Sequence, residues 1–131
     1  MRILFLDDRE SRHRIFIEIN PNHEIEPAYT VEKAVNLLEC CPSFDVVCLD
    51  HDLGGGIYLP SDEKSGFAVA QHIVSMDRKK QPAIVLVHSW NEEGALNMLK
   101  LLREADIQAF YEPFSDNFVI GDNYGKRINS E

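Results

Sequence analysis

Residues 46–52 read Val-Val-Cys-Leu-Asp-His-Asp: four apolar residues, then two aspartates that flank a histidine. An apolar run without alternation is typical of a strand buried on both faces, as in parallel sheets that are covered by helices. Cys48 lies inside this run, so we expect it in the core. The polar residues that follow stand at the carboxyl end of the predicted strand, which is where open α/β sheets bind ligands.

Four other stretches have the composition of strands, and four have the period of helices. Residues 2–6 and 83–87 are continuous apolar runs, whereas residues 24–29 and 108–111 are weaker and suit the edges of a sheet. Helical spacing of the apolar residues predicts helices over residues 11–19, 31–38, 67–74 and 95–102.

Strands and helices alternate along the chain, and most connections between them are short. Right-handed crossovers then place helices on both faces of one parallel sheet. We therefore predict a single α/β domain over residues 1–131, a doubly wound five-stranded parallel sheet with the flavodoxin-like strand order 2-1-3-4-5. Its core would span residues 1–114. Residues 115–131 form a tail without a helical stripe, with turns around the apolar residues 118–120, so we expect the last helix to be reduced or absent.

The composition is that of an ordinary globular chain with an excess of acid. Thirteen Lys and Arg stand against 22 Asp and Glu, a formal net charge of -9, which disfavours binding along an extended nucleic-acid backbone. No apolar run approaches the roughly 20 residues that span a bilayer, so we expect no membrane partner. Cys40, Cys41 and Cys48 are an odd number of cysteines without the spacing of a metal site. This pattern is typical of a protein in a reducing, cytoplasmic compartment. The oligomeric state stays open.

Acidic residues follow two strands that are neighbours in this order. Asp7 and Asp8 end the first strand, and Asp50 and Asp52 follow the third. Crowded carboxylates repel one another and raise each other's pKa unless a cation neutralises them. We therefore predict that these four side chains hold a divalent metal, with Mg²⁺ or Mn²⁺ favoured by carboxylate ligands. The alternative for Asp7 or Asp8 alone is that it caps the following helix.

Two histidines stand at the same predicted edge. His51 lies between the two aspartates after the third strand, and His88 follows the fourth strand. A neutral imidazole ligates metal or moves a proton near pH 7, so we predict Asp50, His51 and His88 as catalytic residues. The alternative for either histidine is a hydrogen-bonded structural role. The other histidines fall in helix and loop patterns and are expected at the surface: His13, His23 and His72.

The residues after His88 suit an anion. Ser89 offers a hydroxyl to a phosphate oxygen, and Asn91 stands at the start of the next predicted helix, whose free backbone N–H groups attract negative charge. Alternatively, Ser89 begins the cap of that helix. We predict Ser89, Trp90 and Asn91 as phosphate- or ligand-binding residues. Trp90, and Tyr58 in a long glycine-rich loop, either stack on a base or pack against the protein, and packing is favoured for each.

Over the predicted core, these residues resemble those of the receiver domains of two-component response regulators. Asp7-Asp8 matches the metal-binding pair of that family, Asp50 its phosphoacceptor, and Pro113-Phe114 the proline–aromatic pair after the fifth strand. Glu112 stands where that family has the lysine that steadies an acyl phosphate. The resemblance implies phosphorylation of Asp50 as one possible function, which Glu112 and the missing last helix disfavour.

Three separated motifs carry a closer resemblance to a known family. Residues 7–9 (Asp-Asp-Arg), 49–54 (Leu-Asp-His-Asp-Leu-Gly) and 88–95 (His-Ser-x-Asn-x-x-Gly-Ala) resemble the cyclic-phosphate processing receiver domains, a divergent group of bacteria and phages. The name of that group rests on a proposed role at cyclic phosphate ends in RNA repair. The resemblance implies metal-assisted chemistry on a cyclic or terminal phosphate.

Three functions stay open at this point. The leading hypothesis is a metal-dependent phosphoesterase that acts on a cyclic or terminal phosphate of RNA or a nucleotide. The second is a binding protein that sequesters a cyclic nucleotide or another phosphorylated ligand without turnover. The third is a signalling receiver that is phosphorylated on Asp50. We expect a nucleotide or an RNA-end phosphate as the ligand, and the sequence does not identify the substrate.

Overall fold

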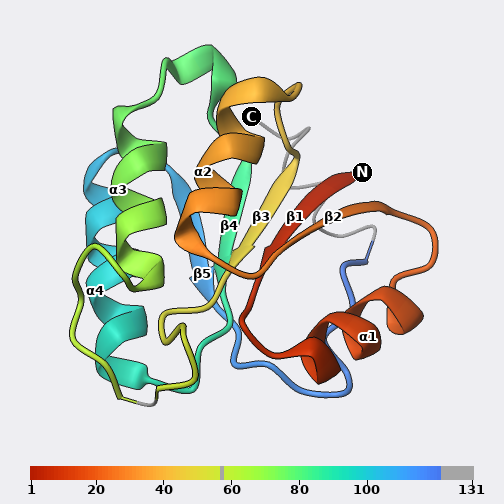
Figure 1. The fold of residues 1–131 in the computed structure, drawn as a ribbon. Helices are drawn as coiled ribbons and strands as arrows, with labels where there is room; N and C mark the ends of the chain where they lie inside the picture. Colours follow the sequence, from red (N-terminus) through yellow and green to blue (C-terminus); the bar gives the residue numbers. More distant parts are fainter. Residues whose placement is uncertain (57, 122–131) are drawn as a thin grey trace.

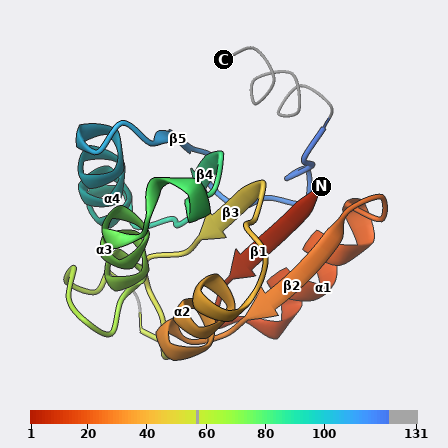
Figure 2. The same ribbon diagram turned by 90° about the horizontal axis from the view of Figure 1, so that it is seen from above.

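The computed structural model describes residues 1–56 and 58–121, and a five-stranded parallel sheet forms the centre of the fold (Figure 1). Its strands are β1 (Arg2–Leu6), β2 (Glu24–Ala28), β3 (Val46–Leu49), β4 (Ile84–Val87) and β5 (Gln108–Tyr111). They lie in the predicted order β2-β1-β3-β4-β5, and every neighbouring pair is parallel (Figure 2). The three buried apolar runs are the central strands, and the two weaker strands lie at the edges, as expected.

Helices connect the strands and cover both faces of the sheet. They are α1 (Glu10–Ile19), α2 (Val31–Cys40), α3 (Gly66–Ser75) and α4 (Glu92–Glu104), with a short 3₁₀ helix η1 (Arg78–Lys80) after α3. Thr30, Ser65 and Asn91 cap α2, α3 and α4, because each side-chain oxygen accepts a backbone N–H of the first turn. No helix among the described residues is long and apolar enough to cross a membrane.

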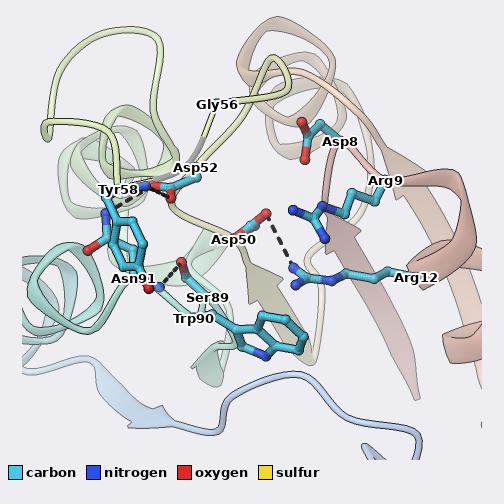
Figure 3. Close-up of a pocket in the computed structure, with 10 residues that line it drawn as sticks. All are labelled: Asp8, Arg9, Arg12, Asp50, Asp52, Gly56, Tyr58, Ser89, Trp90 and Asn91. Atoms are coloured by element: carbon cyan, nitrogen blue, oxygen red, sulfur yellow. Dashed lines mark hydrogen bonds and ion pairs between the residues drawn. The ribbon is translucent and has the colours of Figure 1, made fainter.

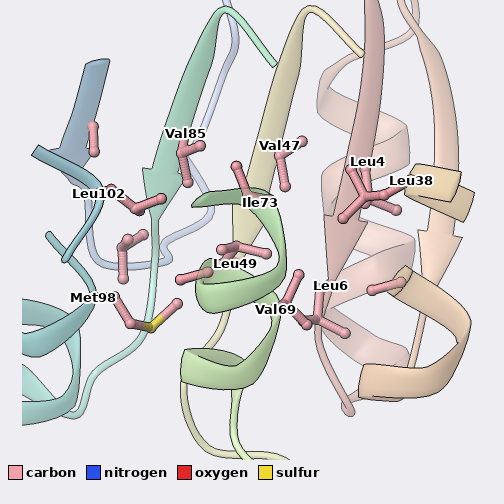
Figure 4. Packing of buried hydrophobic residues seen from close by; sticks show 14 of the residues in the cluster. Leu4, Leu6, Leu38, Val47, Leu49, Val69, Ile73, Val85, Met98 and Leu102 are labelled. Carbon is pink, nitrogen blue, oxygen red and sulfur yellow. The ribbon is translucent and has the colours of Figure 1, made fainter. Parts of the chain in front are cut away.

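Each central strand contributes to two separate cores, because successive side chains point to opposite faces of a sheet. Leu49 and Ile73 belong to the larger core, which α2, α3 and α4 cover (Figure 4). Cys48 and Phe16 belong to the core on the α1 side. The burial of Cys48 confirms the prediction made for it.

The chain after β5 completes the core on the α1 side without a helix. We expected residues 118–120 to be a small patch among turns, but Phe118 and Ile120 are buried members of that core. Asn20, at the end of α1, holds the segment: its amide nitrogen donates to the carbonyl of Phe118 at 3.1 Å, and its amide oxygen accepts from the backbone N–H of Ile120 at 2.7 Å. No helix follows β5 up to residue 121, as predicted. The rest of the predicted tail, residues 122–131, lies outside the described part.

The strand register brings three polar residues to one level. The last residues of β1, β3 and β4 are paired side by side. The residues that follow them are Asp7, Asp50 and His88, so these three meet at the carboxyl edge of the sheet. They are in phase with Phe5 and Cys48, which places them on the α1 side.

Candidate functional site

A cavity of about 180 Å³ opens at the carboxyl edge of the sheet (Figure 3). Six of the nine predicted site residues line it, while Asp7, His51 and His88 are buried and do not. In Figure 3, the arginines and Asp8 lie on one side, Tyr58 and Asn91 lie on the other, and Asp50 lies between them. The residues of the wall are Asp8, Arg9, Arg12, Asp50, Asp52, Gly56, Tyr58, Ser89, Trp90 and Asn91.

Asp7, Asp50 and His88 form a buried group of metal-ligating atoms, of which only Asp50 also lines the cavity. One ligand atom of each residue lies within 4.8 Å of the other two, and the three residues are at most 3% exposed. Oδ2 of Asp7 accepts hydrogen bonds from Nε2 of His88 at 3.0 Å and from Nη1 of Arg12 at 3.1 Å. Two carboxylates, an imidazole and a guanidinium are thus packed together, and Asp50 and Arg12 connect this group to the cavity.

Arg12 is a residue of this site that sequence reasoning missed. Its Nη1 atom lies 3.1 Å from Oδ2 of Asp7 and 3.7 Å from Oδ2 of Asp50. The guanidinium also stacks over Trp90, 4.7 Å from the ring centroid, and lies 5.3 Å from the ring centroid of Phe114. The faces of these aromatic rings attract the positive charge of Arg12. Its position in the sequence could have indicated this role, because Arg12 lies in the first turn of the helix after β1, from which a long side chain reaches the end of that strand.

The two buried aspartates differ in their affinity for a proton. Burial alone would raise the pKa of Asp7, but the hydrogen bond and charge of His88 and the charge of Arg12 outweigh it and hold that pKa below its ordinary value. For Asp50, burial and the negative charge of Asp7 prevail over His88 and Arg12 and raise the pKa to about 6. Burial is thus the main reason that Asp50 takes up a proton more readily than Asp7 does.

Asp50 is fixed by close contact with the start of α3. The backbone N–H of Gly66 donates to the carbonyl of His51 at 2.8 Å, and a Cβ atom on Gly66 would overlap the carbonyl oxygen of Asp50. Only glycine fits at this position. Oδ1 of Asp50 accepts the backbone N–H of His51 at 2.9 Å, and Oδ2 faces Arg12 at the cavity (Figure 3).

Asp52 organises the loop that follows β3. Its Oδ1 atom accepts from Nδ1 of His51 at 2.8 Å and from Nδ2 of Asn91 at 2.9 Å. The backbone N–H of Tyr58 donates to Oδ2 at 2.5 Å, and that of Leu59 donates to Oδ1 at 3.2 Å. Burial would raise the pKa of Asp52, but the bonds from Asn91 and His51 prevail and lower it. Asp52 lines the cavity without joining the group of close ligands, so its role as a metal ligand stays a prediction.

His51 points to the opposite face of the sheet from Asp50, because the two residues are adjacent in sequence. It is fully buried, and its Nε2 atom lies 2.8 Å from Oγ of Ser61. A Cβ atom on Gly94 would lie 2.5 Å from the imidazole, so the first turn of α4 packs directly over the ring. Both ring nitrogens contact the β3–α3 loop. The contacts of His51 favour the structural alternative, and its catalytic role stays a prediction.

His88 is buried on the α1 side of the sheet. Its ring stacks on Phe5, with centroids 4.8 Å and planes 6° apart, and Phe114 and Phe118 contact it from other sides. Within the described residues, its Nδ1 atom has no hydrogen-bond partner. His88 thus contacts Asp7 rather than the cavity, and its hydrogen bond favours the ionised form of that carboxyl.

The expectation that His13 lies at the surface is wrong. His13 is 2% exposed, its Nε2 atom donates to the carbonyl of Asp7 at 2.7 Å, and its ring stacks on Tyr29. The physical reason is the orientation of α1, which buries Arg12, His13 and Phe16. His23 and His72 are half-buried rather than exposed.

The segment after β4 lines the cavity with polar groups. Oγ of Ser89 accepts the backbone N–H of Asn91 at 3.1 Å, which leaves the hydroxyl proton of Ser89 available to donate. Asn91, rather than Ser89, caps α4, because its side-chain oxygen accepts the N–H of Gly94 at 3.0 Å. The amide nitrogen of Asn91 donates to Asp52, so one side chain joins the helix start to the neighbouring loop.

Packing was the favoured interpretation for both aromatic residues near the edge. Trp90 does pack: Nε1 donates to the carbonyl of Phe114 at 2.9 Å, and the ring lies against Arg12, yet 60% of the residue stays exposed. For Tyr58 the prediction is wrong, since it is 75% exposed. Its backbone has a positive φ of 53°, and the hydrogen bond from its N–H to Asp52 holds this conformation.

The carboxylates suit a divalent cation. Asp7 and Asp50, two members of the close group, offer the oxygen donors that Mg²⁺ and Mn²⁺ prefer. Asp8 lines the cavity without joining that group, so its role as a metal ligand stays a prediction. Oδ2 of Asp8 accepts the N–H of Gly55 at 2.6 Å, which holds the glycine-rich loop beside it. Arg12 already contacts Asp7 and Asp50, so a cation would share these ligands with the guanidinium.

Comparisons with solved structures agree with this architecture. The chain is similar to a CheY-like response regulator receiver domain from Methylobacillus flagellatus, with 14% identity and a TM-score of 0.66 over 99% of this chain and 96% of that one. It is also similar to the response regulator TrrA from Thermotoga maritima in complex with Mg²⁺ and BeF, with 24% identity and a TM-score of 0.61 over 98% of this chain and 96% of that one. At these identities, the likeness shows a receiver fold.

Sequence comparison gives a more specific result. A search of curated proteins finds no match. The family described as "Cyclic-phosphate processing Receiver domain" matches residues 2–104, which contain all three motifs that carried the resemblance. The chain therefore belongs to the cyclic-phosphate processing receiver domain family.

Proposed function

We propose that this chain binds the cyclic or terminal phosphate of a nucleotide or RNA end in the cavity and hydrolyses it with the help of a divalent cation. The observation that carries the proposal is the composition of the cavity wall. The guanidinium groups of Arg9 and Arg12 and the hydroxyl of Ser89 share one small space with the carboxylates of Asp8 and Asp50 (Figure 3). The first set binds phosphate oxygens, and the second set holds a cation and water.

In this proposal, the cation is held by Asp7, Asp8 and Asp50, and Mg²⁺ or Mn²⁺ is the first choice. When bound, such an ion polarises a phosphate and lowers the pKa of a neighbouring water. The similar structure from Thermotoga maritima was solved with Mg²⁺, which supports the choice of metal.

The chain's own residues account for the remaining chemistry. Arg12 and Ser89 orient the phosphate and stabilise the charge that builds up on its oxygens in the transition state. The carboxylate of Asp50, which faces the cavity, accepts the proton of the attacking water. The water oxygen bonds to phosphorus, the bond to one ribose oxygen breaks, and that oxygen takes a proton from solvent.

The predicted acid–base role of the histidines has less support. Neither His51 nor His88 is among the residues that line the cavity. We propose instead that both are positioning residues: His88 keeps Asp7 ionised, and His51 fixes Asp52 and the loop.

Phosphorylation of Asp50, as in signalling receivers, is the second candidate. Glu112 directly follows β5, where those receivers have a lysine. However, Nη1 of Arg12 lies 3.7 Å from Oδ2 of Asp50 and would place a positive charge beside an acyl phosphate there. This contact favours a candidate that the sequence alone disfavoured.

Incubation with adenosine 2′,3′-cyclic phosphate and Mg²⁺ or Mn²⁺, followed by chromatography, tests the proposal. We expect hydrolysis that EDTA stops and that Asp50→Asn and Arg12→Gln abolish. Asp116→Asn, at an exposed position after β5, is the matched control and should leave the rate unchanged. A rise in Tm with ligand but no hydrolysis would indicate a binding protein. A phosphate adduct after treatment with acetyl phosphate, absent in Asp50→Asn, would indicate a signalling receiver, and either result overturns the hydrolytic proposal.

A further inference from the structure

We infer that a groove beside the cavity binds the nucleobase of the ligand, so that the substrate is a nucleoside cyclic phosphate and not merely a cyclic phosphate. The inference rests on the proposed function, since it takes the cavity as the phosphate site. It gives a role to Tyr58, Trp90 and the start of α4, which the proposed hydrolysis does not use as binding groups.

The groove has a volume of about 540 Å³ and shares a wall with the cavity. Tyr58, Trp90 and Asn91 line both spaces, so a ligand that leaves the cavity past these residues enters the groove. The cavity, at about 180 Å³, is the right size for a phosphate and a cation. A base and a ribose need the larger neighbouring space.

Two aromatic rings stand where the cavity and the groove meet. Tyr58 and Trp90 are the two most exposed large hydrophobic side chains among the described residues, at 75% and 60%. Their occurrence at one place, rather than scattered over the surface, is typical of a binding site. Aromatic side chains beside a phosphate site stack on bases, and such stacking tolerates any base because each one has a flat face.

The position of Tyr58 is set before any ligand binds. Its φ of 53° lies in the left-handed region, which a residue with a side chain adopts only under strain. The hydrogen bond from its N–H to Oδ2 of Asp52 maintains this conformation, and Asp52 is in turn bonded to Asn91. The ring is therefore presented to solvent by a network anchored at the cavity itself.

The charge of the groove selects an uncharged group. Glu92 and Glu93 lie in its wall, together with Asn97. Two carboxylates repel a second phosphate, so the groove suits a base better than a further stretch of RNA backbone. The amide of Asn97 supplies a group that hydrogen-bonds to the edge of a base.

The experiment compares two ligands that share the same cyclic phosphate ring and differ in whether they carry a base. The intact chain with Mg²⁺ is titrated with adenosine 2′,3′-cyclic phosphate and with glycerol 1,2-cyclic phosphate, which has the cyclic phosphate but no base. Trp90 is the only tryptophan in the sequence, so its fluorescence reports stacking in the groove, and calorimetry gives the affinities. We expect the adenosine compound to bind at least about 10-fold more tightly, and only this compound to quench Trp90.

Variants separate the base from the phosphate. Tyr58→Ala should weaken binding of the adenosine compound about 10-fold and leave the glycerol compound unchanged, whereas Tyr58→Phe should bind like the wild type. Leu96→Ala, which truncates an exposed residue of α4 outside the groove, is the control. Arg12→Gln should weaken both compounds alike.

Two outcomes overturn the inference in different ways. Equal affinity for both compounds, or equal weakening of both by Tyr58→Ala, refutes the base site while the proposed function stands. If neither compound binds in the presence of Mg²⁺ or Mn²⁺, the proposed function fails and the base site fails with it.

Discussion

Nη1 of Arg12 lies 3.7 Å from Oδ2 of Asp50, so the positive charge beside this carboxylate comes from the first turn of α1. In the signalling receivers that the chain resembles, this positive charge comes from a lysine after the fifth strand. In this chain, Glu112 stands at the position of that lysine. A helix on the α1 side of the sheet supplies the charge in this chain. A guanidinium is planar and donates two parallel hydrogen bonds, which suits phosphate oxygens better than an ammonium does.

Arg12→Gln should lower the free energy of unfolding by about 3 kcal/mol, because it leaves Asp7 and Asp50 buried without their cation. Mg²⁺ or Mn²⁺ should raise the Tm of this variant more than that of the wild type, since the carboxylate oxygens are then free for the metal. Thermal melts with metal and with EDTA measure both effects. Arg14→Gln, at an exposed position of α1, is the control. An identical metal response in the variant and the wild type would show that Arg12 and the cation do not share ligands.

Asp50→Asn should stabilise the metal-free protein at neutral pH, and the gain should vanish in acid. The pKa of Asp50 is raised from 3.8 to about 6 in the folded protein. Between these values the folded state keeps a proton that the unfolded state has lost, so wild-type stability falls as pH rises from about 4 to 6. Above pH 6 the difference reaches about 3 kcal/mol at most, from the gap between the two pKa values.

Unfolding by guanidinium chloride in EDTA at pH 4, 6 and 8 measures this difference. Asp116→Asn should show no comparable pH dependence, because its carboxyl is exposed. A constant difference between Asp50→Asn and the wild type across this range would mean that Asp50 titrates alike in the folded and unfolded states.

Gly66→Ala should destabilise the fold by about 3 kcal/mol or more, since the added methyl group overlaps a backbone oxygen of Asp50 that cannot easily move. Gly94→Ala should have a smaller effect, because the methyl group meets the side chain of His51 at 2.5 Å. Gly121→Ala is the control, since a Cβ atom there meets nothing within 4 Å. Denaturant midpoints give the order, and a Gly66→Ala variant as stable as Gly121→Ala would contradict the close approach of α3 to β3.

Asn91→Ser and Asn91→Ala separate two roles of one side chain. Serine keeps an oxygen that caps α4 but removes the amide that donates to Asp52, whereas alanine removes both. We expect Asn91→Ala to cost about 1 kcal/mol more than Asn91→Ser, which is the typical value of a cap. Both variants should be cleaved faster by proteases within residues 54–64, and unchanged cleavage would show that Asn91 does not fasten this loop.

The sheet was predictable because its strands are set by local composition. Stretches rich in apolar residues end at charged or turn-forming residues, and the limits of β1, β3 and β5 agree with the predicted ranges. The predictions for β2 and β4 differ from the structure by one residue at one end. Parallel order and edge positions followed from burial and from short right-handed connections.

Side-chain direction at the strand ends was harder to predict. His51 follows Asp50 directly, and strand alternation should have placed it on the opposite face, as the structure does. His88 shares the face of Asp50 but lies against Phe5, Phe114 and Phe118, which come from distant parts of the chain. No local pattern shows such packing, because it depends on which residues complete the core after the chain has folded.

The carboxylate of Asp52 accepts hydrogen bonds from the backbone of Tyr58 and Leu59 and from the side chain that caps α4. Displacing this loop therefore withdraws a partner from Asn91, so loop opening and fraying of the first turn of α4 become one cooperative motion. The backbone N–H of Gly94 donates to the side-chain oxygen of Asn91. In native-state hydrogen exchange, the backbone amides of Tyr58 and Gly94 should therefore exchange with the same free energy of opening. The stability of a helix end would in this way govern how fast a ligand enters and leaves.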